Sequence, residues 1–341
     1  MAIELITGKD DEGRRLDRIL RKALPDHSLS LIHRLLRQGK IKVNGKSASN
    51  PAERIVEGAV IQIQSKRDVN LSPAQVNPFP SPAPLPEIIW QGAGVIFFNK
   101  PAGLASHGPG SLDTLVKTAL EGKLPHSLSF KPGPLHRLDK PSSGIIAFSQ
   151  TLDGARQFSR LMREQKITKT YLAIVEGRVD RETVWQDTLI RDTSIEKTFV
   201  NSETKQTREK PKNAVTSVKP LACNGFYTLI EVQIKTGRTH QIRAQAAAHG
   251  NPLAGDKKYG GKSIAGKRGG GFSLHAWKIK VCAIKTAQTT AIDDIKTSSI
   301  SSKTQCGFPA EITAPLPEAF QSQIAALFGL RNFTTEDTEE R

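Results

Sequence analysis

The chain has 341 residues, of which 37% are hydrophobic, so it can bury the cores of two domains and is not a disordered polymer. Its 49 Lys and Arg residues exceed its 33 Asp and Glu residues, and the formal charge of +16 favours a polyanionic partner, either nucleic acid or an anionic membrane surface. No apolar run approaches the roughly 18 residues of a spanning helix, and residues 1–13 are too polar and acidic for a signal peptide. We therefore expect a cytoplasmic protein that binds nucleic acid and no membrane.

Cysteine usage and the missing cofactor motifs narrow the chemistry. Cys223, Cys282 and Cys306 show no paired spacing, which argues against a disulfide framework and a zinc site and favours buried or incidental thiols. The sequence contains no P-loop, no glycine-rich dinucleotide fingerprint and no clustered metal ligands. We expect neither a metal ion nor a small-molecule cofactor.

The first predicted elements are two helices and a hairpin. Arg15–Leu24 places its leucines and isoleucine on one helical stripe, and Leu31–Gln38 repeats the pattern with Ser30 as the expected N-cap. The dipeptide Asn44-Gly45 between short apolar runs predicts a hairpin turn, and Ala59–Ile63 predicts a closing strand. These elements form a small α/β module.

This module, residues 13–67, is strongly basic. It contains 13 Lys and Arg residues against 4 Asp and Glu residues, a surplus of nine that could follow phosphates without reading bases, although a solvated basic hairpin fits the composition equally well. The pieces "RLDRIL", "SLIHRLLRQGKIKVNGK" and "GAVIQI" resemble the S4-like RNA-binding domain. That resemblance implies an RNA-facing surface. The candidate RNA-binding residues are Arg18, Arg34, Arg37, Lys40 and Lys42.

Three segments of unusual composition divide the rest of the chain. Six prolines fall within residues 73–86, so 68–86 is predicted to be a semi-rigid linker between the module and a larger domain, residues 87–330. Residues 287–305 are rich in Thr and Ser and predict a solvated insertion. The acidic residues 331–341 predict a flexible tail.

A charged loop in the larger domain carries the first candidate catalytic group. His136–Gly144 ends in glycine and leads into the apolar residues Ile145–Phe148, which predict a strand. Asp139 therefore lies at the edge of a rigid element, a usual position for a catalytic side chain. Taken alone, an ordinary turn with a solvated Asp–Lys pair explains the segment better.

Two further segments carry candidate groups. Lys169–Gly177 predicts a strand that alternates around Tyr171, for which core packing is the simpler explanation. Phe226–Ile234 predicts a second strand, followed by a helix that Thr239 could cap and Gly250 could end. A helix N-terminus beside arginines is a natural anion site, although a structural carboxylate clamp fits too. The residues at this junction are Arg238, His240 and Arg243.

Together these segments are similar to the RluA-type family of pseudouridine synthases. The matching pieces, in order, are "FFNKPAGL", "HRLDKPSSG", "KTYLAIVEG", "TGRTHQIRAQAAAHGNPLAGDKKYGG" and "LHAWKI". We accordingly expect an α+β catalytic domain with a mixed, largely antiparallel sheet flanked by helices and loops. The resemblance also implies an isomerase that converts uridine in RNA to pseudouridine without a cofactor.

The family's site residues carry over by motif. The resemblance makes Asp139 the essential carboxylate, places Tyr171 against the target base and pairs Arg243 with the carboxylate. It assigns Arg137 a role in holding the RNA open. The remaining candidate RNA or base contacts are His136, Arg238, His240 and Ile242.

Two departures from the family pattern stand out. After the HRLD signature and its lysine the family usually has Asp-Thr-Ser-Gly or Glu-Thr-Ser-Gly, whereas this chain has Pro141-Ser142-Ser143-Gly144. Serine keeps the hydroxyl, so little should be lost. The Thr- and Ser-rich segment near the end interrupts a region that is normally continuous in the family.

Large-subunit ribosomal RNA is the first expected substrate and transfer RNA the second, because relatives with this N-terminal module most often modify the former. A monomer is expected. An ionised Asp139 could act as a nucleophile or as a base, at the sugar or at the uracil ring. The rival hypotheses are a non-catalytic RNA-binding ribosome-assembly protein and, more distantly, a metal-dependent nuclease.

Overall fold

The computed structural model describes residues 2–64, 84–124, 126–200, 210–263, 271–282, 307–330 and 333. Most of the predicted linker (68–83), all of the insertion 287–305 with Cys306, and the tail except Phe333 lie outside these residues. The chain forms two compact units. The first comprises Met1–Leu85, Asp113–Gly133 and Ser149–Arg156, and the second comprises Pro86–Leu112, Pro134–Phe148 and Gln157–Arg341.

The first unit contains a four-stranded sheet with the order β1-β4-β2-β3. Its elements are β1 (Ala2–Ile6), η1 (Lys9–Asp11), α1 (Leu16–Ala23), α2 (Leu29–Arg37), β2 (Ile41–Val43), β3 (Lys46–Ser47) and β4 (Val60–Gln64). Asn44 and Gly45 both have positive φ, 50° and 79°, and form the expected two-residue turn between β2 and β3. Strand β1 pairs antiparallel with β4, so this sheet begins well before residue 13.

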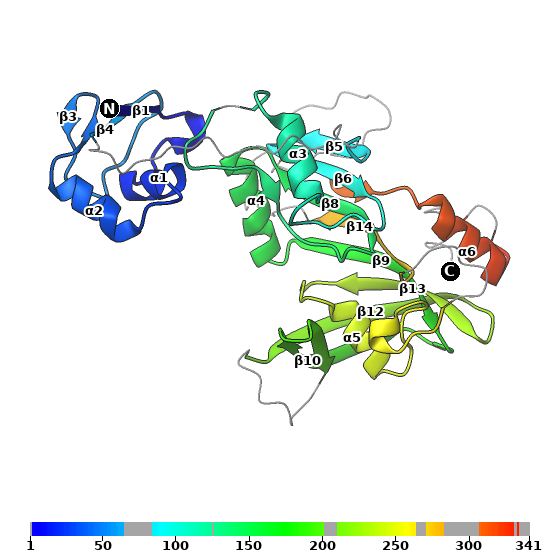
Figure 1. Ribbon diagram of the computed structural model, residues 1–341. Coiled ribbons are helices and arrows are strands. Elements are labelled where there is room, and N and C mark those ends of the chain that lie inside the picture. The colour runs from blue at the N-terminus through cyan, green and yellow to red at the C-terminus, as the bar shows by residue number, and fades with distance from the viewer. Residues whose placement is uncertain are drawn as a thin grey trace, which may run out of the picture. The chain divides into compact units, whose positions relative to one another are not determined.

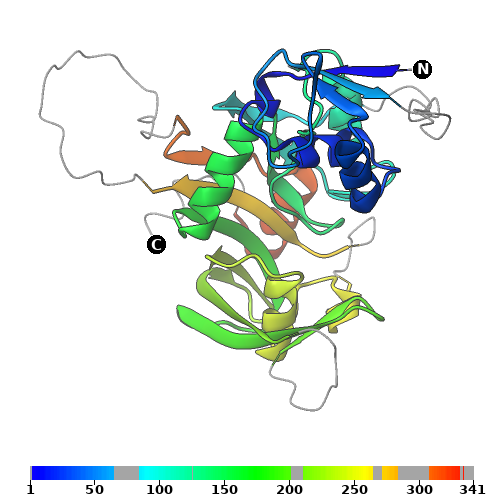
Figure 2. The ribbon, with the colours of Figure 1, turned by 90° about the vertical axis from the view of Figure 1, so that its left-hand side faces the viewer.

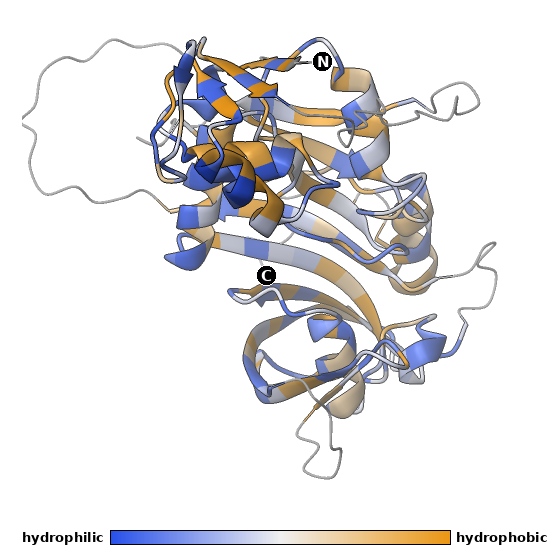
Figure 3. Cartoon of the chain, turned by 60° about the vertical axis from the view of Figure 1, so that its left-hand side comes forward, coloured by the Kyte–Doolittle hydropathy of each residue, from blue (hydrophilic) through white to orange (hydrophobic). Residues whose placement is uncertain are grey.

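Helices α1 and α2 are amphipathic for the predicted reason. The apolar stripe of α1 and residues such as Ile32 and Leu36 of α2 are fully buried in one cluster, while the same helices also carry hydrophilic residues (Figure 3). The predicted cap of α2 was wrong by two residues. Ser28, not Ser30, has the extended backbone that an N-cap needs, and its hydroxyl accepts a hydrogen bond from Leu31 N at 3.2 Å.

A buried carboxylate joins segments that are distant in sequence within the first unit. Asp11 is fully buried and accepts hydrogen bonds from the backbone N–H groups of Leu128 at 2.8 Å and Ser129 at 2.9 Å. Burial opposes its charge, but these and further hydrogen bonds hold the pKa of Asp11 below its usual value. Residues around position 128, which come after the linker, thus pack with the N-terminal module.

The second unit is built on one large sheet with the strand order β11-β10-β12-β13-β9-β14-β8-β6-β5; β15 pairs with β14 and β7 with β8. The β8–β14 pair is parallel, whereas β9 pairs antiparallel with both β13 and β14, so the predicted mixed, largely antiparallel sheet is confirmed (Figure 1). The strands are β5 (Ile88–Gly92), β6 (Val95–Lys100), β7 (Gly133–Pro134), β8 (Ser143–Ser149), β9 (Ile167–Glu176), β10 (Thr183–Asp192), β11 (Lys197–Val200), β12 (Lys212–Cys223), β13 (Tyr227–Ile234), β14 (Leu274–Val281) and β15 (Glu311–Thr313).

Helices accompany this sheet at several points. They are α4 (Leu152–Arg163), whose second half belongs to this unit, α5 (Gln241–Ala248), η2 (Lys257–Tyr259) and α6 (Glu318–Phe328). Helix α3 (Leu112–Leu120) belongs to the first unit except for its first residue. Figure 2 shows the green and yellow strands of the sheet curling around α5. Because two apolar clusters, one with α4 and one with α6, take residues from β9, that strand is buried along most of its length. The predicted alternation around Tyr171 was therefore wrong.

Two other observations bear on the expectations from composition. No helix among the described residues is long and apolar enough to cross a membrane. Cys223 and Cys282 are free thiols on the surface, so of the two expected kinds of thiol, buried or incidental, they are not the buried kind.

Candidate active site

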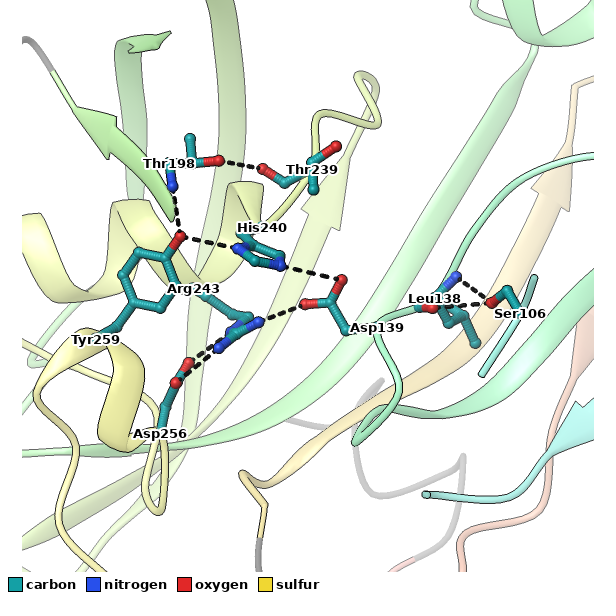
Figure 4. A network of polar contacts seen from close by, with 9 residues as sticks. All are labelled: Ser106, Leu138, Asp139, Thr198, Thr239, His240, Arg243, Asp256 and Tyr259. Atoms are coloured by element: carbon teal, nitrogen blue, oxygen red, sulfur yellow. Dashed lines mark hydrogen bonds and ion pairs between the residues drawn. The ribbon is translucent and has the colours of Figure 1, made fainter. Parts of the chain in front are cut away.

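Asp139 lies in a turn that leads into β8, and the main chain on both sides of it is fixed. Ser142 N donates to the carbonyl of Asp139 at 3.0 Å. On the other side, the buried Ser106 hydroxyl donates to Leu138 O at 2.9 Å and accepts from Leu138 N at 3.1 Å (Figure 4). The Asp139 side chain keeps 23% of its surface exposed, so a held backbone presents a reachable carboxylate.

A buried lysine supports the same turn. Lys100 is fully buried, and its Nζ donates to the carbonyls of Pro101 at 2.9 Å, Leu104 at 2.7 Å and Ser142 at 2.5 Å. Burial lowers the pKa of Lys100 to about 8, although the charge of Asp139 opposes the shift. The ammonium therefore links two loops from different parts of the chain by their backbone oxygens.

The glycine that ends the signature is required by a close approach of strands. Gly144 has φ of 105°, and a Cβ at this position would lie 2.1 Å from the carbonyl oxygen of Ala276 on β14. Next to it, the buried Ser143 hydroxyl lies 2.9 Å from Nδ1 of His275, also on β14. The Pro-Ser-Ser-Gly variant of the motif thus still anchors β8 to its parallel neighbour.

Arg243, on α5, contacts two carboxylates at once. Its Nη1 lies 2.9 Å from Oδ2 of Asp139, while its Nε and Nη2 donate to the two oxygens of Asp256 at 2.6 and 2.8 Å (Figure 4). The rings of Phe272 and Tyr259 flank the guanidinium, at 4.3 and 4.9 Å from its central carbon. Burial opposes the charge, but the two carboxylates raise the pKa of Arg243 above its usual value.

Asp256 and Tyr259 are site residues that the sequence reasoning missed. Asp256 is 2% exposed, and it pairs with the side of the Arg243 guanidinium that does not contact Asp139. The Tyr259 hydroxyl accepts from Thr198 N at 2.8 Å and lies 3.0 Å from Nδ1 of His240. Both residues fall inside the quoted "GNPLAGDKKYGG" piece, which was the available signal.

His240, not Thr239, is the N-cap of α5, so the predicted cap was wrong. The Gln241 side chain accepts from Arg238 N at 3.2 Å, which fixes the segment that leads into the helix. His240 itself has a left-handed backbone, φ 55°, and its Nε2 lies 3.9 Å from Asp139 Oδ1. Burial lowers the pKa of His240, and the charge of Asp139 opposes that shift, so the ring is mainly neutral near pH 7.

Asp139, His240 and Arg243 line one cavity of about 500 Å³, a size typical of small-ligand sites. Tyr171 lines it with 6% of its surface exposed, and burial, aided by the charge of Asp139, raises the pKa of its hydroxyl so that it stays protonated. All eight sequence-predicted residues of the larger domain line this cavity: His136, Arg137, Asp139, Tyr171, Arg238, His240, Ile242 and Arg243.

Comparisons with known proteins agree with this geometry. Residues 94–248 match the family described as RNA pseudouridylate synthase, and residues 14–61 match the S4 domain. Ribosomal large subunit pseudouridine synthase D of Neisseria meningitidis serogroup B is 31% identical over 297 residues, which cover 82% of this chain and 75% of that protein. The chain belongs to the RNA pseudouridine synthase family. It is therefore an isomerase with RNA as its partner.

Further relatives of this synthase support the assignment. An uncharacterized RNA pseudouridine synthase of Aquifex aeolicus is 31% identical over 263 residues, covering 74% of this chain and 79% of that one. The human protein RNA Pseudouridylate Synthase Domain Containing 4 superposes with a TM-score of 0.52 at 22% identity, over 70% of this synthase and 92% of the human chain. The latter likeness shows a shared fold.

Not every predicted contact residue is available for RNA. Although His136 lines the cavity, its Nε2 accepts from Ala147 N at 3.0 Å and its ring stacks on Phe158 at 16°. Burial lowers the pKa of His136 to about 3, so the ring is neutral and supports the strand. By contrast, Arg137 and Arg238 have exposed side chains.

The predicted basic residues of the N-terminal module all belong to the first unit. Arg18, Arg34 and Arg37 are exposed on α1 and α2, and Lys40 and Lys42 are half-buried near β2.

Tyr171→Ala in this synthase is expected to weaken binding of the target RNA by about 1–3 kcal/mol, the usual contribution of base–aromatic stacking, and to lose turnover. Tyr171→Phe keeps the flat ring and should retain binding while losing part of the turnover. Dissociation constants and single-turnover rates for both variants, with melting temperatures as a folding control, test this. Wild-type kinetics for Tyr171→Ala would leave the residue with a packing role only.

Proposed function

We propose that this synthase converts uridines of large-subunit ribosomal RNA to pseudouridine, with Asp139 as the essential carboxylate. The observation that carries the proposal is the Asp139–Arg243 contact of 2.9 Å in a cavity that Tyr171 also lines. The substrate is supported by relatives such as ribosomal large subunit pseudouridine synthase C of Haemophilus influenzae, which is 31% identical over 271 residues. The enzyme would act as a monomer, because one chain supplies every assigned residue. A ribosomal RNA substrate is compatible with the expected cytoplasmic location.

The reaction detaches uracil from C1′ at N1, turns the ring and rejoins it through C5. The product is an isomer of the substrate, so no oxidant, reductant or group donor is consumed. Asp139 would act as a nucleophile or a base, and both roles need an ionised carboxylate within reach of the substrate. Arg243 would hold that carboxylate in place, because its other donors are fixed on Asp256.

The remaining groups would handle the base and the backbone. A uridine stacked inside a helix cannot reach a cavity, so the target would have to be extruded or already unpaired. The Tyr171 ring offers a flat surface for the detached uracil. The exposed arginines Arg137 and Arg238 line the same cavity and could contact the flanking phosphates.

Chemical mapping of pseudouridine in total RNA, from cells with and without this protein, tests the substrate. The expected result is the loss of one or more sites from large-subunit ribosomal RNA, restored by the purified enzyme on the unmodified RNA. Sites lost only from transfer RNA would overturn the ribosomal assignment while keeping the chemistry. No change in any RNA, together with an inactive purified protein, would favour a non-catalytic binding role.

The N-terminal module is expected to add affinity through phosphates. Replacing Arg18, Arg34 and Arg37 together with glutamine should reduce the slope of log affinity against log salt by about two to three units. Substitution is preferable to deleting the module, because deletion removes Asp11 and its hydrogen bonds to Leu128 and Ser129.

Salt titrations of RNA binding, for wild type and variant, measure this slope. Glu57→Gln is the matched control, since it changes an exposed charge of the same unit in the opposite direction and should not flatten the slope. An unchanged slope for the triple variant would make the basic surface a bystander.

A further inference from the structure

Lys169 is a buried lysine with no acidic partner in the described part of the chain. It is 5% exposed and lines the same cavity as Asp139 and Tyr171. Burial lowers the pKa of Lys169 to about 8, and among the described residues no carboxylate forms an ion pair with its Nζ. A buried cation is costly unless something offsets its charge.

Lys100 is a buried lysine with a structural role, and its hydrogen-bond acceptors can be compared with those of Lys169. Both side chains are buried and the pKa of each is lowered to about 8. The Lys100 ammonium donates to backbone carbonyls, including those of Leu104 and Ser142. Lys169 has no such set of acceptors among the described residues, so its donors remain available to a ligand.

The position of Lys169 directs those donors to the substrate. It precedes Tyr171 by two residues on β9, and side chains at this spacing lie on the same face of a strand. A Cβ on Gly237 would lie 3.0 Å from Lys169 Nζ, which places the ammonium against the segment between β13 and α5. The base that stacks on Tyr171 would therefore lie within the same part of the cavity as the ammonium.

The groups nearest to Lys169 do not offset its charge. The charge of Lys169 helps lower the pKa of His136, after burial, so the two groups are neighbours. Since His136 Nε2 accepts from Ala147 N, the neutral ring carries its proton on Nδ1, which is buried and adds no acceptor beside Lys169. The carboxylate of Asp139 is taken by Arg243. An electron-rich ligand in the cavity would supply the acceptor that the Lys169 ammonium lacks.

The reaction generates such a ligand. When the N1–C1′ bond breaks, its electron pair stays on uracil and spreads from N1 to the O2 and O4 oxygens. The C5–C1′ bond then forms, C5 loses its proton and N1 gains one, so that charge and atoms balance. Between these events the detached ring is an anion, and a fixed positive charge held in a buried position beside it stabilises that anion.

On the basis of the function proposed above, we propose that Lys169 is a further catalytic residue, which binds a carbonyl oxygen of the target uracil and stabilises the ring anion after the N1–C1′ bond breaks. A backbone phosphate is the competing ligand. The burial of Lys169 beside Tyr171 favours the base, because phosphates are better reached by the exposed arginines of the cavity.

Lys169→Met and Lys169→Gln in the full chain test the proposal, on whichever RNA the wild-type enzyme converts. Single-turnover rates should fall about 10²–10³-fold, the usual effect of removing one preorganised donor, while the dissociation constant stays within about threefold. Lys235→Met, which removes an exposed lysine just after β13, is the matched control and should keep the wild-type rate. Melting temperatures identify any variant that fails to fold. If Lys169→Met does not fold, Lys169→Gln, which keeps a polar group at this position, provides the rate.

A second substrate separates the base from the phosphate. Fluorine at C5 withdraws electrons and stabilises the ring anion, so on RNA with 5-fluorouridine at the target the rate defect in ring detachment should shrink. An equal defect on both substrates with weaker binding would assign Lys169 to a phosphate and overturn the proposal, as would a wild-type rate. The Lys169 test compares the rates of variant and wild type on the same RNA, so its result does not depend on which RNA is the natural substrate. The substrate proposal fails only if the wild-type enzyme leaves ribosomal RNA unchanged.

Discussion

Asp139→Asn is expected to lower single-turnover isomerisation by about 10⁴-fold or more, the range seen when a nucleophile or its charged partner is removed, and to leave RNA affinity nearly unchanged. The amide has almost the shape of the carboxylate, and the backbone contacts of the turn through Ser106 and Lys100 do not involve the side chain. Arg243 keeps its two bonds to Asp256. The charge that performs the chemistry is therefore the principal loss.

Release of the C5 hydrogen from labelled uridine in RNA measures this effect, because that hydrogen leaves only when the ring has been rejoined through C5. Asp153→Asn is the control, since that carboxylate has a side chain that is 88% exposed and does not line the cavity. Turnover by Asp139→Asn that persists after repeated purification would show that another group carries out the essential step.

Local patterns were enough to predict much of the fold. The apolar stripe of α1 is a periodic signal, and Asn44-Gly45 is a turn signal that depends on two adjacent residues. The capping residues were harder, because Ser28 and Ser30 are chemically equal and the backbone decides between them. The start of α5 depends on the left-handed backbone of His240, which a local pattern does not predict.

The site divides in the same way between local and distant signals. Asp139 and Arg243 are 104 residues apart, and only the joint order of the motifs indicated that they meet. Asp256 escaped notice because its partner lies on a different element, and an aspartate in a loop is ordinary in composition. Lys100 escaped because its acceptors are backbone carbonyls, which every residue has and which therefore leave no trace in the sequence.

Arg243→Leu is expected to lose turnover and also to destabilise the enzyme by about 3–5 kcal/mol, the usual cost of leaving a buried charge without its partner. The stranded charge is Asp256, whose side chain is only 1% exposed. A loss of activity in this variant alone therefore cannot separate catalysis from folding. A second substitution, at Asp256, separates the two effects. It removes the buried charge that has lost its partner, but it does not restore a partner for Asp139.

The double variant Arg243→Leu, Asp256→Leu should regain most of the lost stability in urea denaturation and remain inactive in single-turnover assays. Arg238→Leu is the control: this arginine lines the same cavity but is exposed, so its loss should weaken RNA binding more than it slows the reaction. Recovery of turnover together with stability in the double variant would reduce Arg243 to a structural clamp. Full activity in Arg243→Leu together with an inactive Arg238→Leu would instead mean that Asp139 pairs with Arg238, not with Arg243, when RNA is bound.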